Sequence, residues 1–314
     1  MKLITGFALL SMPIVACTST TLDAPTGPVK QYAVAPTNLT AEQGKFLVQP
    51  KHVVKAHSDT MTCWVPDWVP DQDYMVTHFE PLQGANGHHL LALRSGSSYK
   101  PGTVFDCTDV AQMVDLQPLV LPELSDTPLL PDGYAVKLPK DAHIVMQSHY
   151  LNTTDQDIET QDVGVFKFAP AGTKPQEVSY LVLNDGGIKL PAGQALTRTT
   201  KCKIPGDIKL LTVMGHMHQW GKSVTLDLER AATPGKIDNL YKVDPWQAQY
   251  RDKPPLTNYG LANALQLAPG DTYSITCSWN NSTAADIKFP HEMCASVAYY
   301  FPARPEGLIV CDNE

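Results

Sequence analysis

The sequence of 314 residues lacks several features that would place it in a common class. No CxxC pair is present, which excludes a zinc ribbon and a thioredoxin-type motif. There is no excess of positive charge, since the formal net charge is -8, so nucleic acid is not an expected partner. No stretch of a dozen residues keeps a helical period. The apolar run at residues 4–15 is too short to span a bilayer.

The start of the chain has the features of a bacterial export signal. After the apolar run, Ile14-Val15-Ala16-Cys17 resembles a lipobox, with cleavage before Cys17 and lipid attached to its sulfur. An ordinary secretory signal with an incidental cysteine is the alternative. Because Thr18 rather than Asp follows, a Gram-negative host would send the protein to the outer membrane. We therefore expect a signal peptide (1–16), a lipidated tether (17–40), and an exported body held at a bacterial membrane.

Short runs rich in Val, Ile, Thr and Tyr, separated by turn signals, fill the rest of the chain. This pattern predicts an all-β protein of two tandem antiparallel β-sandwiches, jelly-roll-like, in residues 41–172 and 176–314. The segment 169–175, rich in Pro, Gly and Ala, is the best candidate for the linker. The expected strands are residues 45–54, 61–69, 74–80, 88–93, 135–138, 142–151, 163–168, 177–183, 197–204, 208–214, 223–229, 241–243, 264–267, 272–280 and 295–301.

Two histidines stand two residues apart at the end of one expected strand. His216 and His218 flank Met217. Side chains at i and i+2 of a strand share a face, so both imidazoles can reach one metal ion while Met217 points the other way.

A second group of histidines gives a weaker signal for a metal site. His88 and His89 are adjacent, so in a regular strand they would face opposite sides. They can share a metal only if the backbone bulges or the pair lies at a strand entrance, and the preceding Gly87 makes such a distortion cheap. His149, at the end of a strong expected strand, is the third candidate. An HH pair alone is weak evidence for a metal site.

Met293 adds a soft sulfur ligand near the end of the chain. Two imidazoles with a thioether suit copper, because a soft sulfur favours Cu(I). Three imidazoles suit copper or zinc. The other histidines, which we do not expect to be ligands, are His52, His57, His78, His143 and His291.

The cysteines fit an exported protein. Setting Cys17 aside leaves an even number, which predicts disulfides, but sequence alone leaves the pairing open. Three sequons matter only if the lipobox is false and the host eukaryotic; they begin at Asn38, Asn152 and Asn281.

In order along the chain, these motifs resemble the copper type II ascorbate-dependent monooxygenases, the group of peptidylglycine α-hydroxylating monooxygenase and dopamine β-hydroxylase. The resemblance runs from about residue 45 to residue 311. The ordered set is highly specific, although HxH alone is not. Its segments are Phe79-Glu80-Pro81 with His88-His89, Gln147-Ser148-His149-Tyr150, His216-Met217-His218 with Gly221-Lys222, Pro269-Gly270-Asp271, and Glu292-Met293-Cys294 with Tyr299-Tyr300.

The resemblance implies two mononuclear copper sites that face each other across an interdomain cleft. An electron-transfer copper would be held by His88, His89 and His149. The catalytic, oxygen-binding copper would be held by His216, His218 and Met293. With O2 and ascorbate as reductant, such an enzyme hydroxylates a C–H bond of a small-molecule substrate. The implied disulfides are Cys63–Cys107, Cys202–Cys311 and Cys277–Cys294.

Two departures from the family bear on the substrate. Peptide-amidating members have an Arg, which grips the peptide carboxylate, where Met214 stands here, and a substrate-binding Tyr where Val297 stands. Met cannot pair with a carboxylate, so a glycine-extended peptide is not the expected substrate. A phenethylamine-like compound and a wholly different molecule both stay open, and no protein partner is identifiable.

Two other classes of function compete with the enzyme. One is a copper-binding lipoprotein that stores, transfers or senses copper without turnover, through the same ligands. The other is a zinc hydrolase or a purely structural sandwich protein.

Overall fold

A computed structural model describes residues 27–97, 99–108, 116–120, 130–251, 253–289 and 291–312. Across these residues the fold is all-β, as predicted, with a single 3-10 turn, η2 (Ala248–Arg251). No helix in the described ranges is long and apolar enough to cross a membrane. The expected signal peptide and lipidated Cys17 lie outside these ranges.

The N-terminal half is built from two sheets that pack face to face. One has the strand order β7-β4-β10-β6-β8, and the other is the run β9-β5-β12-β2. Their buried faces meet in one core, where Phe79 and Phe166 lie with ring centroids 4.9 Å apart. A small third sheet has the order β1-β11-β3. The strands are β1 (Val29–Tyr32), β2 (Gly44–Val48), β3 (His52–Val54), β4 (Ser58–Trp64), β5 (Tyr74–Leu82), β6 (Gly87–Ser95), β7 (Val104–Asp106), β8 (Leu116–Val120), β9 (Tyr134–Leu138), β10 (His143–Asn152), β11 (Ile158–Gln161) and β12 (Val163–Phe168).

The C-terminal half repeats this layering. The run β19-β16-β23-β13, joined by β20 and β24, packs on a four-stranded sheet of order β15-β21-β17-β18, and β14 pairs with β22. Alternating buried residues, such as Leu226 on β17 and Ile275 on β21, fill the core. The strands are β13 (Gln176–Asn184), β14 (Lys189–Leu190), β15 (Ala195–Lys203), β16 (Ile208–His216), β17 (Gly221–Glu229), β18 (Ile237–Val243), β19 (Thr257–Asn258), β20 (Leu265–Leu267), β21 (Thr272–Asn280), β22 (Ile287–Lys288), β23 (Ala295–Phe301) and β24 (Ile309–Asp312).

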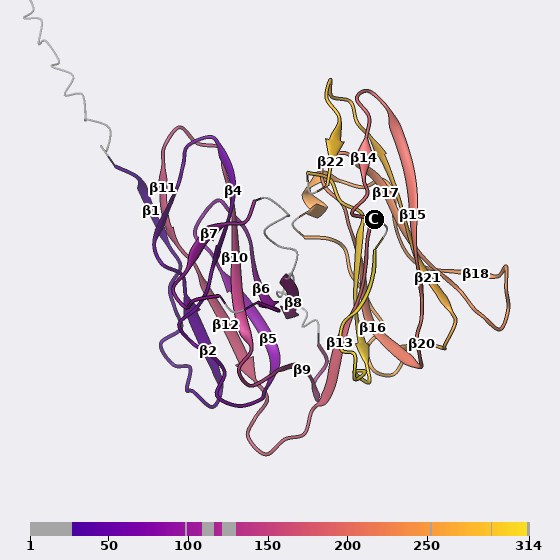
Figure 1. The fold of residues 1–314 in the computed structure, drawn as a ribbon, viewed down its shortest axis with the longest axis horizontal. Helices are drawn as coiled ribbons and strands as arrows, with labels where there is room; N and C mark the ends of the chain where they lie inside the picture. Colours follow the sequence, from indigo (N-terminus) through magenta and orange to yellow (C-terminus); the bar gives the residue numbers. More distant parts are fainter. Residues whose placement is uncertain are drawn as a thin grey trace, which may run out of the picture.

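The two halves lie side by side (Figure 1). Strand pairing shows that they share one sheet. Strand β13 pairs with β23 at one end, and its first residues, Gln176 to Val178, pair in parallel with β9. The result is a ten-stranded sheet that runs through both halves. Aromatic contacts support the junction: the rings of Tyr180 and Tyr299 lie 4.8 Å apart. The segment 169–175 precedes β13 and contains no strand, but its flanking strands belong to the same sheet.

The expected tether, residues 17–40, contains a strand that sequence analysis missed. β1 pairs in parallel with β11, with Val29 opposite Ile158. The hydroxyl of Tyr32 hydrogen bonds to Glu159, and the ammonium group of Lys51 lies 4.3 Å from the Tyr32 ring centroid. These partners are distant in sequence, so local composition gave no sign of them.

Three disulfides are present, in the pairing that the resemblance implies: Cys63–Cys107, Cys202–Cys311 and Cys277–Cys294.

Two of the three sequons are structural turns. Asn152 is 1% exposed and Asn281 is 0% exposed. Each side-chain amide donates to three backbone carbonyl oxygens, and each side-chain oxygen accepts from the Thr two residues on. In this fold neither amide nitrogen is open to carbohydrate attachment.

Candidate metal centres

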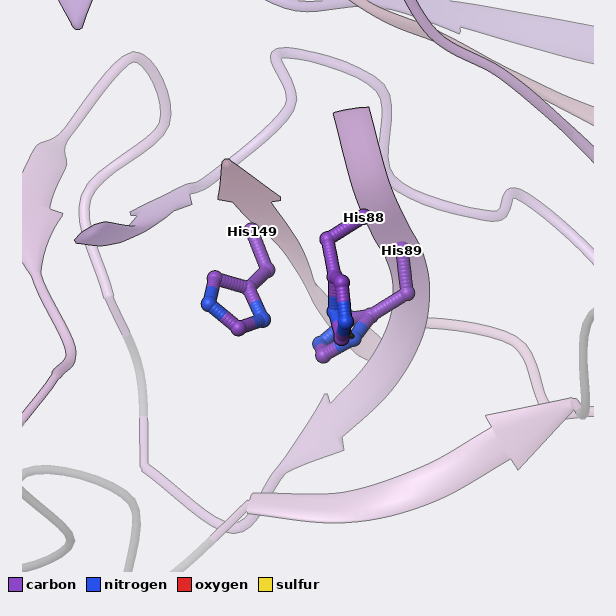
Figure 2. A group of neighbouring side chains, drawn as sticks. All are labelled: His88, His89 and His149. Atoms are coloured by element: carbon purple, nitrogen blue, oxygen red, sulfur yellow. Dashed lines mark hydrogen bonds between the residues drawn. The ribbon is translucent and has the colours of Figure 1, made fainter. Parts of the chain in front are cut away.

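Three histidines of the N-terminal half converge on one point (Figure 2). His88 and His89 come from β6 and His149 from β10. One ring nitrogen from each lies within 4.8 Å of the others, and the Nδ1 atoms of His88 and His89 are 3.2 Å apart. Ring centroids are 4.4 Å apart for His88–His149 and 4.8 Å for His89–His149.

A β-bulge allows adjacent histidines to share this point. In the β6–β10 ladder, His149 stands opposite His89, but Tyr150 stands opposite Gly87. His88 is therefore the extra residue of the bulge, and its side chain turns to the same side as that of His89. Of the two arrangements that the sequence left open, a bulge and a strand entrance, the structure has the bulge.

Hydrogen bonds fix which nitrogen two of these rings present. Nε2 of His89 lies 3.3 Å from the side-chain oxygen of Gln147, and Nε2 of His149 lies 2.5 Å from a carboxylate oxygen of Asp59. Both oxygens accept, so each Nε2 carries the proton and each Nδ1 offers a lone pair. Nδ1 of His149 is buried and has no hydrogen-bond partner among the described residues. A buried, unsatisfied lone pair that faces two other imidazoles fits a metal ion.

The second pair of histidines also comes together, although one detail of the prediction is wrong. β16 ends at His216, and His218 lies in the turn that follows rather than in the strand. The rings are still 5.1 Å apart and nearly perpendicular. Met217 is fully buried in the core, so it points away from the pair as expected.

The turn after His216 is held by contacts outside the strand ladder. The indole N–H of Trp246 donates to the His218 carbonyl oxygen at 2.9 Å. Trp246 packs so closely that a Cβ on Gly221 would lie 2.7 Å from its ring, which explains the glycine there. Nδ1–H of His218 donates to the carbonyl oxygen of His291 at 3.0 Å. The lone pair of His218 is therefore on Nε2.

Met293 lies on the segment that faces this turn. His216 pairs with Ala295 in the β16–β23 ladder, so two further steps of the same register bring Met293 opposite His218. A side-chain contact supports this juxtaposition, because Glu292 accepts hydrogen bonds from the backbone N–H groups of both His218 and Met293, at 2.5 and 2.9 Å.

Four of the imidazoles have lowered pKa values and so are neutral, with a lone pair to offer, at neutral pH: those of His89, His149, His216 and His218. Burial, followed by the charges of His218, Arg251 and His88, lowers the pKa of His216 to about 3. Burial and then Arg251 lower the pKa of His218 to about 4. Burial is also the main reason why the pKa values of His89 and His149 are lowered. Neutral imidazoles are the form that binds metals.

These same interactions connect the two groups of histidines. His88, in the N-terminal half, acts on both His216 and His218, and Arg251 at the end of η2 acts on His149 and Asp59 as well as on the second pair. The two candidate centres therefore lie within electrostatic reach of each other. By contrast, a groove of about 750 Å³ along β5 and β12 contains none of the candidate ligands.

Sequence analysis missed several residues of this region. Asp59 and Arg251 carry no motif and approach the histidines only in the fold. Glu292 was recognised as part of a motif but without a role. Gln147, on the strand of His149, was likewise recognised only as part of a motif.

Comparison with known proteins finds a family that part of the chain resembles. Residues 188–313 match the family model described as "Copper type II ascorbate-dependent monooxygenase, C-terminal domain". This part of the chain is thus similar to the C-terminal domain of that family. The matched region contains His216, His218 and Met293, whereas the three histidines of the N-terminal half lie outside the match. The resemblance seen in the sequence is thereby confirmed for the C-terminal half.

The other comparisons add nothing to this identification. No curated protein matches the chain. A solved structure titled "Crystal Structure of the STIV MCP" is 7% identical and covers 82% of this chain and 97% of its own, with a TM-score of 0.30. The structure of the Gx strain of infectious bursal disease virus is 10% identical and covers 88% of this chain and 75% of its own, with a TM-score of 0.23. Similarity at this level supports no inference about this chain.

Proposed function

We propose that this protein is a copper-dependent monooxygenase that hydroxylates a C–H bond of a small organic substrate with O2 and a reductant such as ascorbate. The observation that carries the proposal is the family match over residues 188–313, which contains an HxH pair and a methionine held on facing segments. Copper suits this donor set, because two imidazoles and a thioether favour Cu(I).

The proposal includes two copper ions per chain. One would be held by His88, His89 and His149. Their ring nitrogens converge, and the buried Nδ1 of His149 has no hydrogen-bond partner among the described residues, as expected for a metal ligand. The other would be held by His216, His218 and Met293. When bound, copper supplies the one-electron and oxygen chemistry that amino acid side chains lack.

The protein's own part is to orient and shelter these ligands. Gln147 and Asp59 hold two imidazoles with Nδ1 free, and the His291 carbonyl holds His218 with Nε2 free. Burial keeps the rings unprotonated and limits access of water. The charge of Arg251 further disfavours protonation of the histidines that it reaches.

The place of action is also a proposal. Lipid on Cys17 would hold the body at a bacterial membrane after export, and the substrate, O2 and reductant would reach it there as small molecules. The lipobox at residues 14–17 is what supports this step.

The test of function is ascorbate-driven O2 uptake by the copper-loaded full-length chain, screened against amines, peptides and aromatic compounds. Substrate-dependent uptake should incorporate one atom of ¹⁸O2 into the product. Tight copper binding with no product from any class would favour copper storage, transfer or sensing. A stoichiometric zinc content in protein purified without added metal would contradict both copper functions.

The test of the ligands uses Met293→Ala and His216→Ala. Both should abolish hydroxylation while the protein keeps one copper ion, because the three histidines of the N-terminal half are untouched. His57→Ala, which removes a surface imidazole bonded to Asp155, is the matched control and should keep both ions and full turnover. Full turnover in either ligand variant would mean that the roles are misassigned.

A further inference from the structure

A fully buried carboxylate lies between the two segments that carry the proposed ligands of the second centre. Glu292 is 0% exposed. One of its oxygens accepts from the backbone N–H groups of His218 and Met293, at 2.5 and 2.9 Å, and the other accepts from the N–H of Trp220 at 3.0 Å. Burying a carboxylate is costly, and a set of charge-assisted hydrogen bonds is what offsets such a cost.

The hydrogen bonds to Glu292 lie just beyond the end of the β16–β23 ladder. Backbone pairing between β16 and β23 stops at His216 and Ala295. His218 and Met293 each lie two residues beyond this last pair, so the ladder does not hold them together. The side chain of Glu292 joins the backbone N–H groups of the turn to the backbone N–H of Met293 on the facing segment. The hydrogen bond from Nδ1–H of His218 to the carbonyl oxygen of His291 is a second connection between the turn and this segment.

We propose that Glu292 is a positioning residue, whose carboxylate fixes the separation of His218 and Met293 before any metal binds. The inference rests on the proposed function, because it assumes that these two residues are ligands of one copper ion. A thioether is a weak ligand and gains most from being held in place. The disulfide at Cys294 anchors the same segment from the other side of Met293.

The variant that tests this is Glu292→Gln. Glutamine keeps the shape but replaces one acceptor oxygen with an NH2 group, which would face a backbone N–H. The matched control is Asp271→Asn. Asp271 is 2% exposed, lies in the same half, and accepts from the backbone N–H groups of Ala231 and Ala268, but it contacts none of the proposed ligands in the described part of the chain.

Three measurements on the full-length protein separate positioning from general stability. Thermal unfolding without metal should show a loss in both variants. Cu(I) competition should show second-site affinity lowered about 10- to 100-fold in Glu292→Gln only, the size typical of lost support for a metal ligand, with first-site affinity unchanged. The copper–sulfur signal in X-ray absorption should disappear in the same variant. A copper–sulfur signal and second-site affinity equal to wild type would overturn the proposal.

Hydrogen exchange in the wild-type, metal-free protein tests the same point if Glu292→Gln does not fold. The amides of His218, Trp220 and Met293 should be protected, although they lie outside the strands. Rapid exchange at all three would show that the carboxylate does not hold them.

Failure of this inference can be told from failure of the proposed function. If Met293→Ala leaves the copper–sulfur signal intact, the ligand assignment is wrong and the role of Glu292 falls with it. If Met293→Ala removes the signal and Glu292→Gln does not, the assignment stands and only the positioning role is refuted.

Discussion

A carboxylate oxygen of Asp59, on β4, lies 2.5 Å from Nε2 of His149, on the neighbouring strand β10. This hydrogen bond is the main reason why the pKa of Asp59 is lowered. It also leaves Nδ1 of His149 as the buried lone pair that faces His88 and His89. A carboxylate behind a metal-binding imidazole fixes the ring and strengthens it as a ligand.

Replacement of Asp59 should therefore weaken the first centre. We expect Asp59→Ala to lower copper affinity there about 10- to 100-fold, measured by Cu(I) competition, with the second centre unaffected. Asp155→Ala is the control, because Asp155 makes a similar contact of 2.8 Å with the exposed His57. Equal copper affinity in wild type and Asp59→Ala would contradict the role of this pair.

Stability without metal should depend on pH through the buried histidines. The native pKa values of His218 and His216, about 4 and 3, lie below the ordinary value of 6.5. The unfolded chain therefore binds more protons as the pH falls below about 6.5, and the free energy of unfolding falls with it until the native rings protonate. The lowered pKa of His218 alone corresponds to a decrease of about 3 kcal/mol in the free energy of unfolding by the time the pH has fallen below about 4.

Urea unfolding of the metal-free protein between about pH 4.5 and 7.5 measures this dependence. His218→Gln should flatten the slope, whereas the surface variant His57→Gln should leave it unchanged. A slope that does not differ between wild type and His218→Gln would refute the assignment.

Arg251 should act on both centres at once. Its charge lowers the pKa values of His149, His216 and His218, so Arg251→Gln should raise all three in the metal-free protein. NMR titration of the imidazole Cε1–H signals measures the shifts. Removal of a neighbouring cation in Lys253→Gln is the control and should shift them less. A rise confined to the second pair would mean that Arg251 does not reach the N-terminal half.

Asp162 should stabilise the segments that carry the histidines of the first centre. It is fully buried and accepts hydrogen bonds from Ser148, from Tyr150 at 2.5 Å and from Gln83 at 3.0 Å. The first two flank His149, and the third precedes the turn that leads to His88. Asp162→Asn should lower the free energy of unfolding by about 1 to 3 kcal/mol, the cost of leaving a buried donor unsatisfied. Ser148→Ala removes one donor and should cost less in the same urea titration.

The sequence was most informative where chemistry is local. The alternation of apolar residues predicted most strands. The adjacency of His88 and His89 left two arrangements open for a shared metal, a bulge or a strand entrance, because a regular strand cannot turn both rings to one side, and the structure has the bulge. The HxH spacing predicted the second pair, although His218 lies past the end of the strand, since its N–H bonds to Glu292 instead of to β23.

What the sequence did not predict depends on partners that are distant along the chain. Asp59 is separated from His149 by 90 residues, and nothing near it marks it as part of a site. The strand β1 was hidden in a segment that looks like a tether, because its pairing partner, β11, lies far along the chain. The parallel contact between β9 and β13 was missed for the same reason.

The pairing of β9 with β13 predicts how the protein responds to cleavage in the segment 169–175. If this segment were a free hinge between independent domains, a single peptide cleavage there would separate the two halves of the chain. Because β9 and β13 are neighbours in one continuous ladder, a protease nick between Gly172 and Lys174 should leave both fragments together through gel filtration, to part only in denaturant.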